Sequence, residues 1–139
     1  MTQPPAQLPP ANGKLRLAIE VVWTYARVRK AMFRTDLPTS LRHIRGGAGR
    51  STSTQPMPLE TGLRLGRAVT RTLAVLPADS RCLVQSLVLT AMLARRGTAA
   101  TVVIGVKSGE SFGAHAWVEM DGQPLLPTFG DEFSRLVDL

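Results

Sequence analysis

Two residues have the chemical types and the surroundings expected of nucleophilic catalysis. Cys82 is the single cysteine of the 139-residue chain, and the pattern around it predicts a position in the first turn of a helix. There, free backbone amides and the positive end of the helix dipole stabilise a thiolate, and neighbouring Arg81 adds positive charge. A buried structural cysteine is the alternative interpretation, because free cysteines are commonly buried. A second residue, His115, favours the interpretation of Cys82 as a catalytic residue.

His115 lies near the start of a predicted β-strand, in the run GAHAWVE at residues 113–119. A core strand does not need histidine for packing, whereas a base for a helix-borne thiol must lie beside that thiol. A strand that follows the helix can supply it. A histidine at a surface edge is the alternative, which we consider a better description of His43. We therefore expect Cys82 to be the nucleophile and His115 the general base and acid.

A third group should orient the imidazole, and the hairpin pattern restricts where it can stand. Asp121-Gly122 is typical of a two-residue hairpin turn. Continued along the strand, that turn places Thr128 opposite His115, or Pro127 if the register slips by one residue. Neither is a carboxylate, and Asp121 itself is about 20 Å along the strand from His115.

Asp131 and Glu132 follow shortly after the facing position and can fold back toward the ring. We select Asp131 as the orienting group, with Thr128 or a backbone carbonyl as the alternatives. Trp117 and Glu119 lie on the same side of the strand as His115. We expect both to bind substrate, although Trp117 is also suited to packing and Glu119 to a position facing solvent.

Metal and phosphate chemistry have little support in the sequence. Two histidines and one cysteine at these spacings do not form a convincing zinc site. The run GGAG at residues 46–49 follows no clear strand, so it is a linker and not a phosphate-binding loop. We expect neither a metal nor a cofactor.

Hydrophobic periodicity predicts the elements that position these residues. The expected helices cover residues 14–33, 40–44, 59–76 and 81–96, and the expected strands cover 100–106, 114–120 and 123–126. Leu37-Pro38 should end the first helical region and Pro77 the third helix. The fourth helix should begin at a cap, Asp79 or Ser80, and end at a left-handed Gly97, with Leu83, Leu87, Ala91 and Ala94 on its apolar face. A helix followed by an antiparallel meander indicates an α+β fold.

Charge divides the chain into regions. We expect a disordered tail over 1–13, a basic helical region and linker over 14–58, and the catalytic core over 59–139. Residues 1–58 hold nine Lys/Arg and two Asp/Glu, a net charge of +7, whereas residues 59–139 hold eight of each. A basic region can bind nucleic acid, anionic lipid or an acidic protein, or can be a solvated helix face. We expect Arg27, Lys30 and Arg34 of this region to bind a partner.

Several protein classes are disfavoured. One cysteine cannot form an intramolecular disulfide, which suits a reducing cytoplasm. The N-terminus lacks the pattern of a signal peptide, and the apolar stretch over 15–33 contains five charged residues, so we expect no membrane span. Aromatic residues make up 5% of the chain, which argues against stacking on single-stranded nucleic acid.

The motifs together resemble the transglutaminase-like peptidases of lasso peptide biosynthesis. The resemblance is carried by RCL at 81–83, LARRG at 93–97, VIGV at 103–106, FGAHAWVE at 112–119 with Asp121-Gly122, and EFSRL at 132–136. It implies a papain-like cysteine peptidase that removes the leader from a ribosomally made lasso precursor in antibiotic biosynthesis. The length fits the split form of the family. That form works with a small winged-helix leader-binding protein and an ATP-dependent, asparagine-synthetase-like cyclase.

By position, the resemblance assigns the nucleophile to Cys82 and the base to His115. The family's aspartate falls near position 127, where this sequence has proline. Two other functions are compatible with the residues. One is acyl transfer to an amine on the same scaffold, and the other is a non-enzymatic basic module that binds nucleic acid or an acidic peptide.

Overall fold

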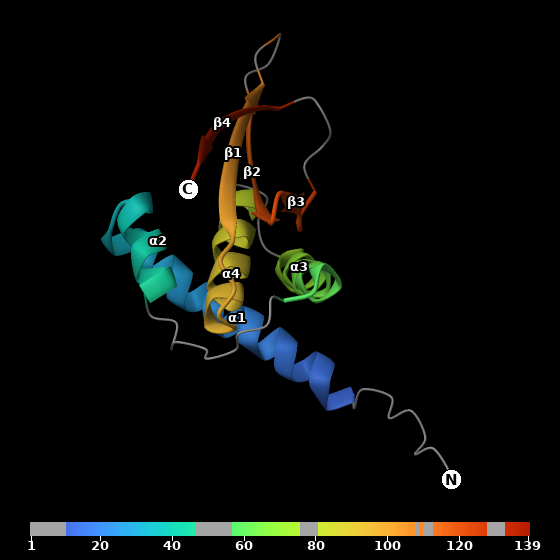
Figure 1. Cartoon of the computed structure of the whole chain (residues 1–139). Coiled ribbons are helices and arrows are strands. Elements are labelled where there is room, and N and C mark those ends of the chain that lie inside the picture. The colour runs from blue at the N-terminus through green and yellow to red at the C-terminus, as the bar shows by residue number, and fades with distance from the viewer. Residues whose placement is uncertain (1–10, 47–56, 76–80, 108, 110–112, 128–132) are drawn as a thin grey trace.

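The fold is α+β, as expected from the sequence. The computed structural model describes residues 11–46, 57–75, 81–107, 109, 113–127 and 133–139, and these form four helices and a four-stranded antiparallel sheet (Figure 1). The elements are α1 (Ala11–Arg34), α2 (Leu37–Gly46), α3 (Leu59–Leu73), α4 (Arg81–Arg95), β1 (Thr101–Lys107), β2 (Gly113–Met120), β3 (Gln123–Pro124) and β4 (Ser134–Asp138). The disordered tail was predicted over 1–13 and the linker over 45–58, but residues 11–13 begin α1 and residues 45–46 end α2. Residues 1–10 and 47–56 and the helix-ending Pro77 lie outside the described residues.

Helix α4 is the central element, because it contacts α1, α2, α3 and the sheet. The sequence predicted one apolar face for it, including Leu83 and Ala94. The helix is instead buried on every side from Ser86 to Leu93, while Leu83 and Ala94 are only half-buried. A helix covered by other helices and by a sheet has no solvent-facing side, which is why a one-face pattern describes it poorly.

Two hydroxyl side chains are buried within α4 without loss of hydrogen bonding. Ser86 Oγ donates to the carbonyl of Cys82 and Thr90 Oγ1 donates to the carbonyl of Ser86, each over 2.8 Å. Bonds to the preceding turn satisfy hydroxyl groups that burial would otherwise penalise. The helix therefore tolerates small polar residues along the side that begins at Cys82.

The end of α4 confirms the predicted left-handed glycine. Gly97 has a φ of +76°. Its N–H donates to the carbonyl of Ala94 over 2.9 Å, and the N–H of Thr98 donates to the carbonyl of Leu93 over 3.0 Å. This pair of bonds is the Schellman motif, which satisfies carbonyls at a helix end. It turns the chain sharply from α4 into β1.

The region around Pro38 differs from the expectation. Leu37-Pro38 does not end a helical region but begins α2, which runs to Gly46 and is longer than predicted. Proline is tolerated in the first turn of a helix, where backbone N–H groups have no helical partner. A hydrogen bond from Thr39 lowers the pKa of the Asp36 carboxyl, as expected of a residue that caps this turn.

The sheet has the strand order β3-β2-β1-β4. The hairpin prediction is confirmed, because Met120 pairs with Gln123 and both turn residues, Asp121 and Gly122, have positive φ. Strand β3 is only two residues long, although the N–H of Leu125 still donates to the carbonyl of Val118. Strand β4 was not predicted. It pairs with β1, with a register shift between Ile104 and Gly105.

One hydrophobic core joins the N-terminal helices to the rest of the chain. Val21 and Val28 of α1 and Leu41 of α2 belong to the same buried cluster as the α4, β1 and β2 side chains. Figure 1 shows α1 passing diagonally beneath α4, with α2 and α3 on opposite sides of it. Among the described residues, no helix is both long and apolar enough to cross a membrane.

Candidate active site

Cys82 occupies the first turn of α4, as the sequence predicted, and is half-buried. The turn leaves backbone amides without helical partners, so an anion at this position meets N–H donors and the positive end of the helix dipole. The expected capping residues, Asp79 and Ser80, lie outside the described part of the chain. A negative charge at the start of α4 would therefore face these donors.

A pocket of about 310 Å³ lies between α3, α4, β2 and the segment after β3, and both predicted catalytic residues line it. The full lining consists of Thr70, Arg81, Cys82, Gln85, His115, Ala116, Leu126 and Pro127. Cys82 reaches the pocket from a helix end and His115 from the start of a strand. The packing of α4 against β2 brings these two residues to the same pocket.

The imidazole of His115 is held by a backbone carbonyl. Its Nε2 lies 2.6 Å from the carbonyl oxygen of Pro127. A carbonyl can only accept a hydrogen bond, so Nε2 carries the proton and donates it. In the neutral ring, Nδ1 is then the unprotonated nitrogen. The bond therefore favours the tautomer in which a proton would be taken up at Nδ1.

Aromatic rings surround the imidazole on the other sides. The ring of His115 stacks on Trp117 at a centroid distance of 5.9 Å and tilts against Phe133 at 5.5 Å. Gly105 lies opposite His115 in the neighbouring strand. A Cβ at Gly105 would meet the Trp117 ring at 2.9 Å and Phe133 at 3.0 Å, so the absence of a side chain there makes room for both rings.

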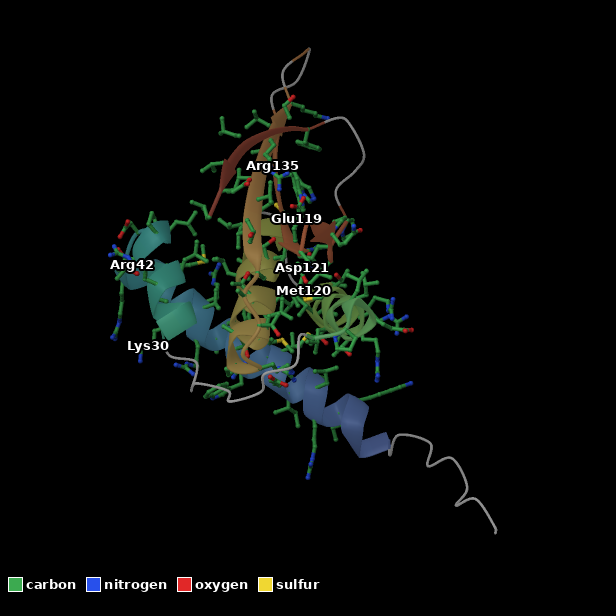
Figure 2. The ribbon with its side chains drawn as sticks, viewed as in Figure 1. Lys30, Arg42, Glu119, Met120, Asp121 and Arg135 are labelled. Atoms are coloured by element: carbon green, nitrogen blue, oxygen red, sulfur yellow. The ribbon has the colours of Figure 1, made fainter. Side chains whose placement is uncertain are left out.

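Glu119 holds the Trp117 ring in place. The indole Nε1–H of Trp117 donates to one carboxylate oxygen of Glu119 over 3.1 Å, and Arg135 donates to the other. Figure 2 shows Glu119 and Arg135 along the sheet, where β4 brings Arg135 toward β2. Trp117 is only 6% exposed. Substrate binding by Trp117 and Glu119 stays a prediction, and their contacts give them a packing role beside His115.

Helix α3 sets the position of the segment that carries Pro127. Gly66 approaches this segment so closely that a Cβ would lie 2.3 Å from the carbonyl oxygen of Leu125. One turn earlier, Gly62 lies against the side chains of Met120 and Leu125, each 3.2 Å from where its Cβ would be. Figure 2 shows Met120 and Asp121 next to α3. Two glycines in α3 thus allow the hairpin to pack against the helix.

Gln85 is a polar pocket residue that the sequence reasoning missed. It follows Cys82 by three positions on α4, and its half-buried side chain lines the same pocket. Residues three apart on a helix share a face, so the helical spacing alone was enough to place it beside the thiol. Its amide offers N–H donors to a substrate carbonyl. Phe133 was also missed, because only the tertiary structure brings it against His115.

Other predicted residues are not brought to this pocket or cannot be placed. Asp131, Glu132 and Thr128 lie outside the described residues, as does the side chain of His43. Arg27, Lys30 and Arg34 are exposed on α1 and are absent from the lining of the Cys82 pocket. Within the described part of the chain, no group of three His, Cys, Asp or Glu side chains is arranged to hold a metal ion.

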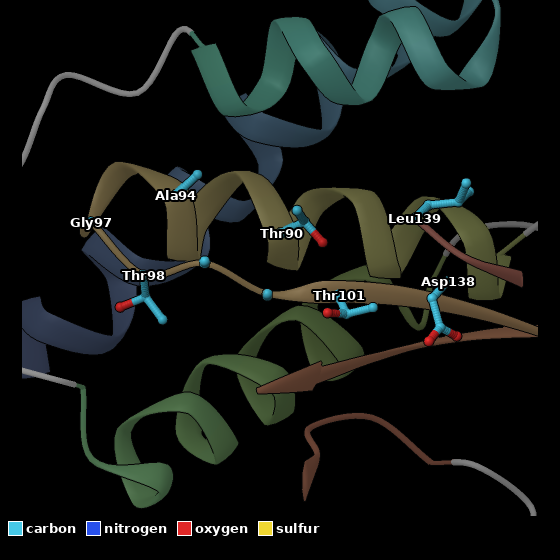
Figure 3. A pocket seen from close by; sticks show the side chains of 9 residues that line it. Thr90, Ala94, Gly97, Thr98, Thr101, Asp138 and Leu139 are labelled. Atoms are coloured by element: carbon cyan, nitrogen blue, oxygen red, sulfur yellow. The ribbon is translucent and has the colours of Figure 1, made fainter. Parts of the chain in front are cut away.

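A larger pocket, of about 650 Å³, lies toward the other end of α4 (Figure 3). Its walls include Thr90 and Ala94 of α4, Thr101 at the start of β1, and Asp138. Thr90 is eight residues beyond Cys82, which corresponds to about 12 Å along a helix. The larger pocket is therefore separate from the thiol, and it contains no cysteine or histidine. Of these two pockets, the smaller is the one that both predicted catalytic residues line.

Comparison with known proteins agrees with this fold. Residues 15–137 match the family model described as the transglutaminase-like superfamily. Comparisons with curated proteins and with solved structures gave no significant match. Because the matched region covers most of the chain, including α1 and α2, the protein belongs to the transglutaminase-like superfamily. This superfamily generally contains cysteine proteases and acyltransferases, enzymes that form an acyl bond to a thiol.

Proposed function

We propose that this protein is a cysteine endopeptidase that removes the leader peptide from a ribosomally synthesised lasso peptide precursor. In this proposal a separate winged-helix protein binds the leader, and an ATP-dependent, asparagine-synthetase-like cyclase closes the ring afterwards. We place the reaction in the cytoplasm, where a single thiol stays reduced. The main support is that Cys82 and His115 line one pocket, with Nε2 of the imidazole bonded to Pro127.

The reaction follows from the tautomer of His115. Nδ1 takes the proton of the Cys82 thiol, and the thiolate attacks the carbonyl carbon at the junction of leader and core. The carbon–sulfur bond forms, the carbon–nitrogen bond breaks, and the imidazolium gives its proton to the departing amine. Water then attacks the thioester and gives a proton to Nδ1, which releases the leader as a carboxylic acid and restores the thiol.

Two donors are suited to the oxyanion that forms during each attack. The backbone N–H of Cys82 is at a helix N-terminus, where amides are free to bind an anion. The Gln85 side chain lines the same pocket and supplies the second donor that the sequence did not reveal. Trp117 and Phe133 keep water away from one side of the imidazole. We propose these roles together as one site.

The test supplies a lasso precursor peptide together with a leader-binding protein. Mass spectrometry of the mixture should show free leader and free core with the unaltered protein. Cys82→Ala and His115→Ala should give neither product, and circular dichroism should show that both variants are folded. Unchanged cleavage by Cys82→Ala would overturn the proposal. A leader that ends in an amide instead of a carboxyl would indicate acyl transfer to an amine.

The basic residues of α1 are proposed to bind the leader or its carrier. Arg27, Lys30 and Arg34 are exposed and lie near the end of α1. Reversal of all three charges should reduce precursor cleavage in the presence of the carrier and leave attack on a short generic peptide unchanged. Equal loss on both substrates would point to misfolding and would contradict a docking role.

A further inference from the structure

Helix α1 has two apolar faces, and among the described residues one of them is packed while the other is exposed. Val21 and Val28 are 0% and 1% exposed, because this side packs on α3 and α4. On the opposite side, Leu15, Ile19, Val22 and Phe33 are 54–80% exposed. A helix that is apolar on both sides is normally buried on both. The second face of α1 therefore has the composition of an interface.

The exposed residues have the spacing of a coiled-coil seam. Positions 15, 19, 22, 26, 29 and 33 follow one another at alternating intervals of four and three, and all six are exposed. This is the a/d repeat, which keeps a narrow line of side chains facing a partner helix. We name these residues the α1 seam: Leu15, Ile19, Val22, Ala26, Arg29 and Phe33. A line of this spacing packs against the side chains of another helix. It does not match an extended peptide, whose side chains on one face repeat every two residues.

The charges beside the α1 seam indicate an acidic partner. Arg16, Arg27, Lys30 and Arg34 are exposed on one side of it, and Arg29 is within it, whereas the flank with Ala18 and Tyr25 is half-buried. The single acidic residue of α1 is Glu20, and its carboxylate is already paired with Arg95 and Arg96. Two copies of this chain packed seam to seam would bring these cations together. A helix with acidic flanks would pair with them instead.

A lipid surface fits the α1 seam less well. Interfacial helices present a broad apolar face with cations on the polar side. Here Arg29 stands in the apolar line itself, with its guanidinium 5.2 Å from the centre of the Phe33 ring. Insertion of that face into acyl chains would bury the cation, whereas a partner carboxylate can neutralise it.

We propose that the α1 seam binds an amphipathic helix with an apolar a/d stripe and acidic flanks, on a protein that brings the substrate. That the partner brings the substrate rests on the proposed function, whereas the binding surface itself does not. Helix α1 packs on α4, the helix that carries Cys82. A protein bound to the α1 seam is therefore held close to that helix. The α1 seam thus extends the docking role proposed for Arg27, Lys30 and Arg34, because it specifies the shape and the charge of the partner.

The probe is a synthetic helical peptide with Leu at the a and d positions and Glu at the flanking positions, fluorescently labelled. It is titrated with the full chain carrying Cys82→Ala. We expect binding that weakens at least about tenfold with Ile19→Glu and also falls as salt increases. Val75→Glu is the matched control, because Val75 is 88% exposed on another part of the surface and should leave binding unchanged.

Four outcomes would overturn this proposal. The first is equal binding of a peptide with Lys in place of Glu, and the second is binding unaffected by Ile19→Glu. The third is a dimer in solution that Ile19→Glu dissociates, which would identify a second copy as the occupant. The fourth is binding to phosphatidylserine vesicles but not to the peptide. A separate failure of the unaltered protein to cleave precursor would contradict the proposed function and leave peptide binding as an independent result.

Discussion

The Nε2 atom of His115 donates a hydrogen bond of 2.6 Å to the carbonyl oxygen of Pro127. Proline stands where the resemblance places an aspartate, and its carbonyl takes the position of the orienting acceptor. A backbone carbonyl was the alternative to Asp131, and the carbonyl of Pro127 lies within hydrogen-bond distance of the ring. Asp131 lies outside the described residues, so its role stays a prediction. Any residue carries a carbonyl, so the backbone can supply this bond where the side chain cannot.

Substitution at Pro127 tests whether its backbone carbonyl or its side chain matters for orienting His115. Pro127→Ala keeps the carbonyl, and we expect its kcat/KM to stay within about threefold of the parent. Asp131→Asn should also cost less than about threefold, because Nε2 has one proton and Pro127 already accepts it. Loss of about a hundredfold or more with Asp131→Asn, measured on the precursor, would instead make Asp131 the orienting group.

Gly66 should matter for activity although it does not line the Cys82 pocket. A Cβ at this position would overlap the carbonyl oxygen of Leu125, and backbone cannot move aside as a side chain end can. We expect Gly66→Ala to lower the free energy of unfolding by about 1–3 kcal/mol and to lower kcat by displacing Pro127. Gly62→Ala is the matched control, since only flexible side chains lie near it. Equal effects of the two substitutions on kcat would contradict this positioning role.

Gln85 gives a test of the oxyanion site. Removing one oxyanion donor typically costs about a hundredfold to a thousandfold in kcat. We expect Gln85→Ala to show such a loss with little change in KM, and Gln85→Glu to be no better, because a carboxylate repels the oxyanion. Circular dichroism and the melting temperature check that α4 is intact. A change confined to KM would assign Gln85 to substrate binding alone.

Glu20 joins α1 to the end of α4. Its two carboxylate oxygens accept hydrogen bonds from Arg96 over 2.8 and 2.9 Å, and Arg95 lies 3.5 Å away. The hydrogen bond from Arg96, together with the charges of both arginines, lowers the pKa of Glu20 below its ordinary value of 4.5, against the opposing effect of burial. The folded state therefore binds this proton less readily than the unfolded state does.

The pH dependence of stability follows from that sign. The contribution of Glu20 is fully present above pH 4.5 and is lost as the pH falls through the lower pKa of the folded state. We expect Glu20→Gln to lower the free energy of unfolding by about 1–2 kcal/mol at neutral pH. The difference between parent and variant should shrink in acid, as urea unfolding at several pH values would show. A difference that is the same at every pH would contradict the ion pairing.

Local signals in the sequence determined much of the framework. The period of apolar residues located α1 and α3, Asp121-Gly122 set the register of β2 and β3, and Gly97 ended α4 as predicted. These features depend on the φ values and side-chain spacing of neighbouring residues, which the sequence contains directly. The same reasoning placed Cys82 in a helical first turn and His115 near the start of a strand.

Only the tertiary structure decided what surrounds those two residues. The burial of α4 on every side, the pairing of β4 with β1, and the approach of Gly66 to Leu125 depend on packing between elements far apart in the chain. The acceptor for His115 is a main-chain oxygen. Every residue type carries one, so the residue type at position 127 could not predict it. The sequence thus pointed to two side chains that line one pocket. The position of the imidazole was decided by a backbone segment packed against α3.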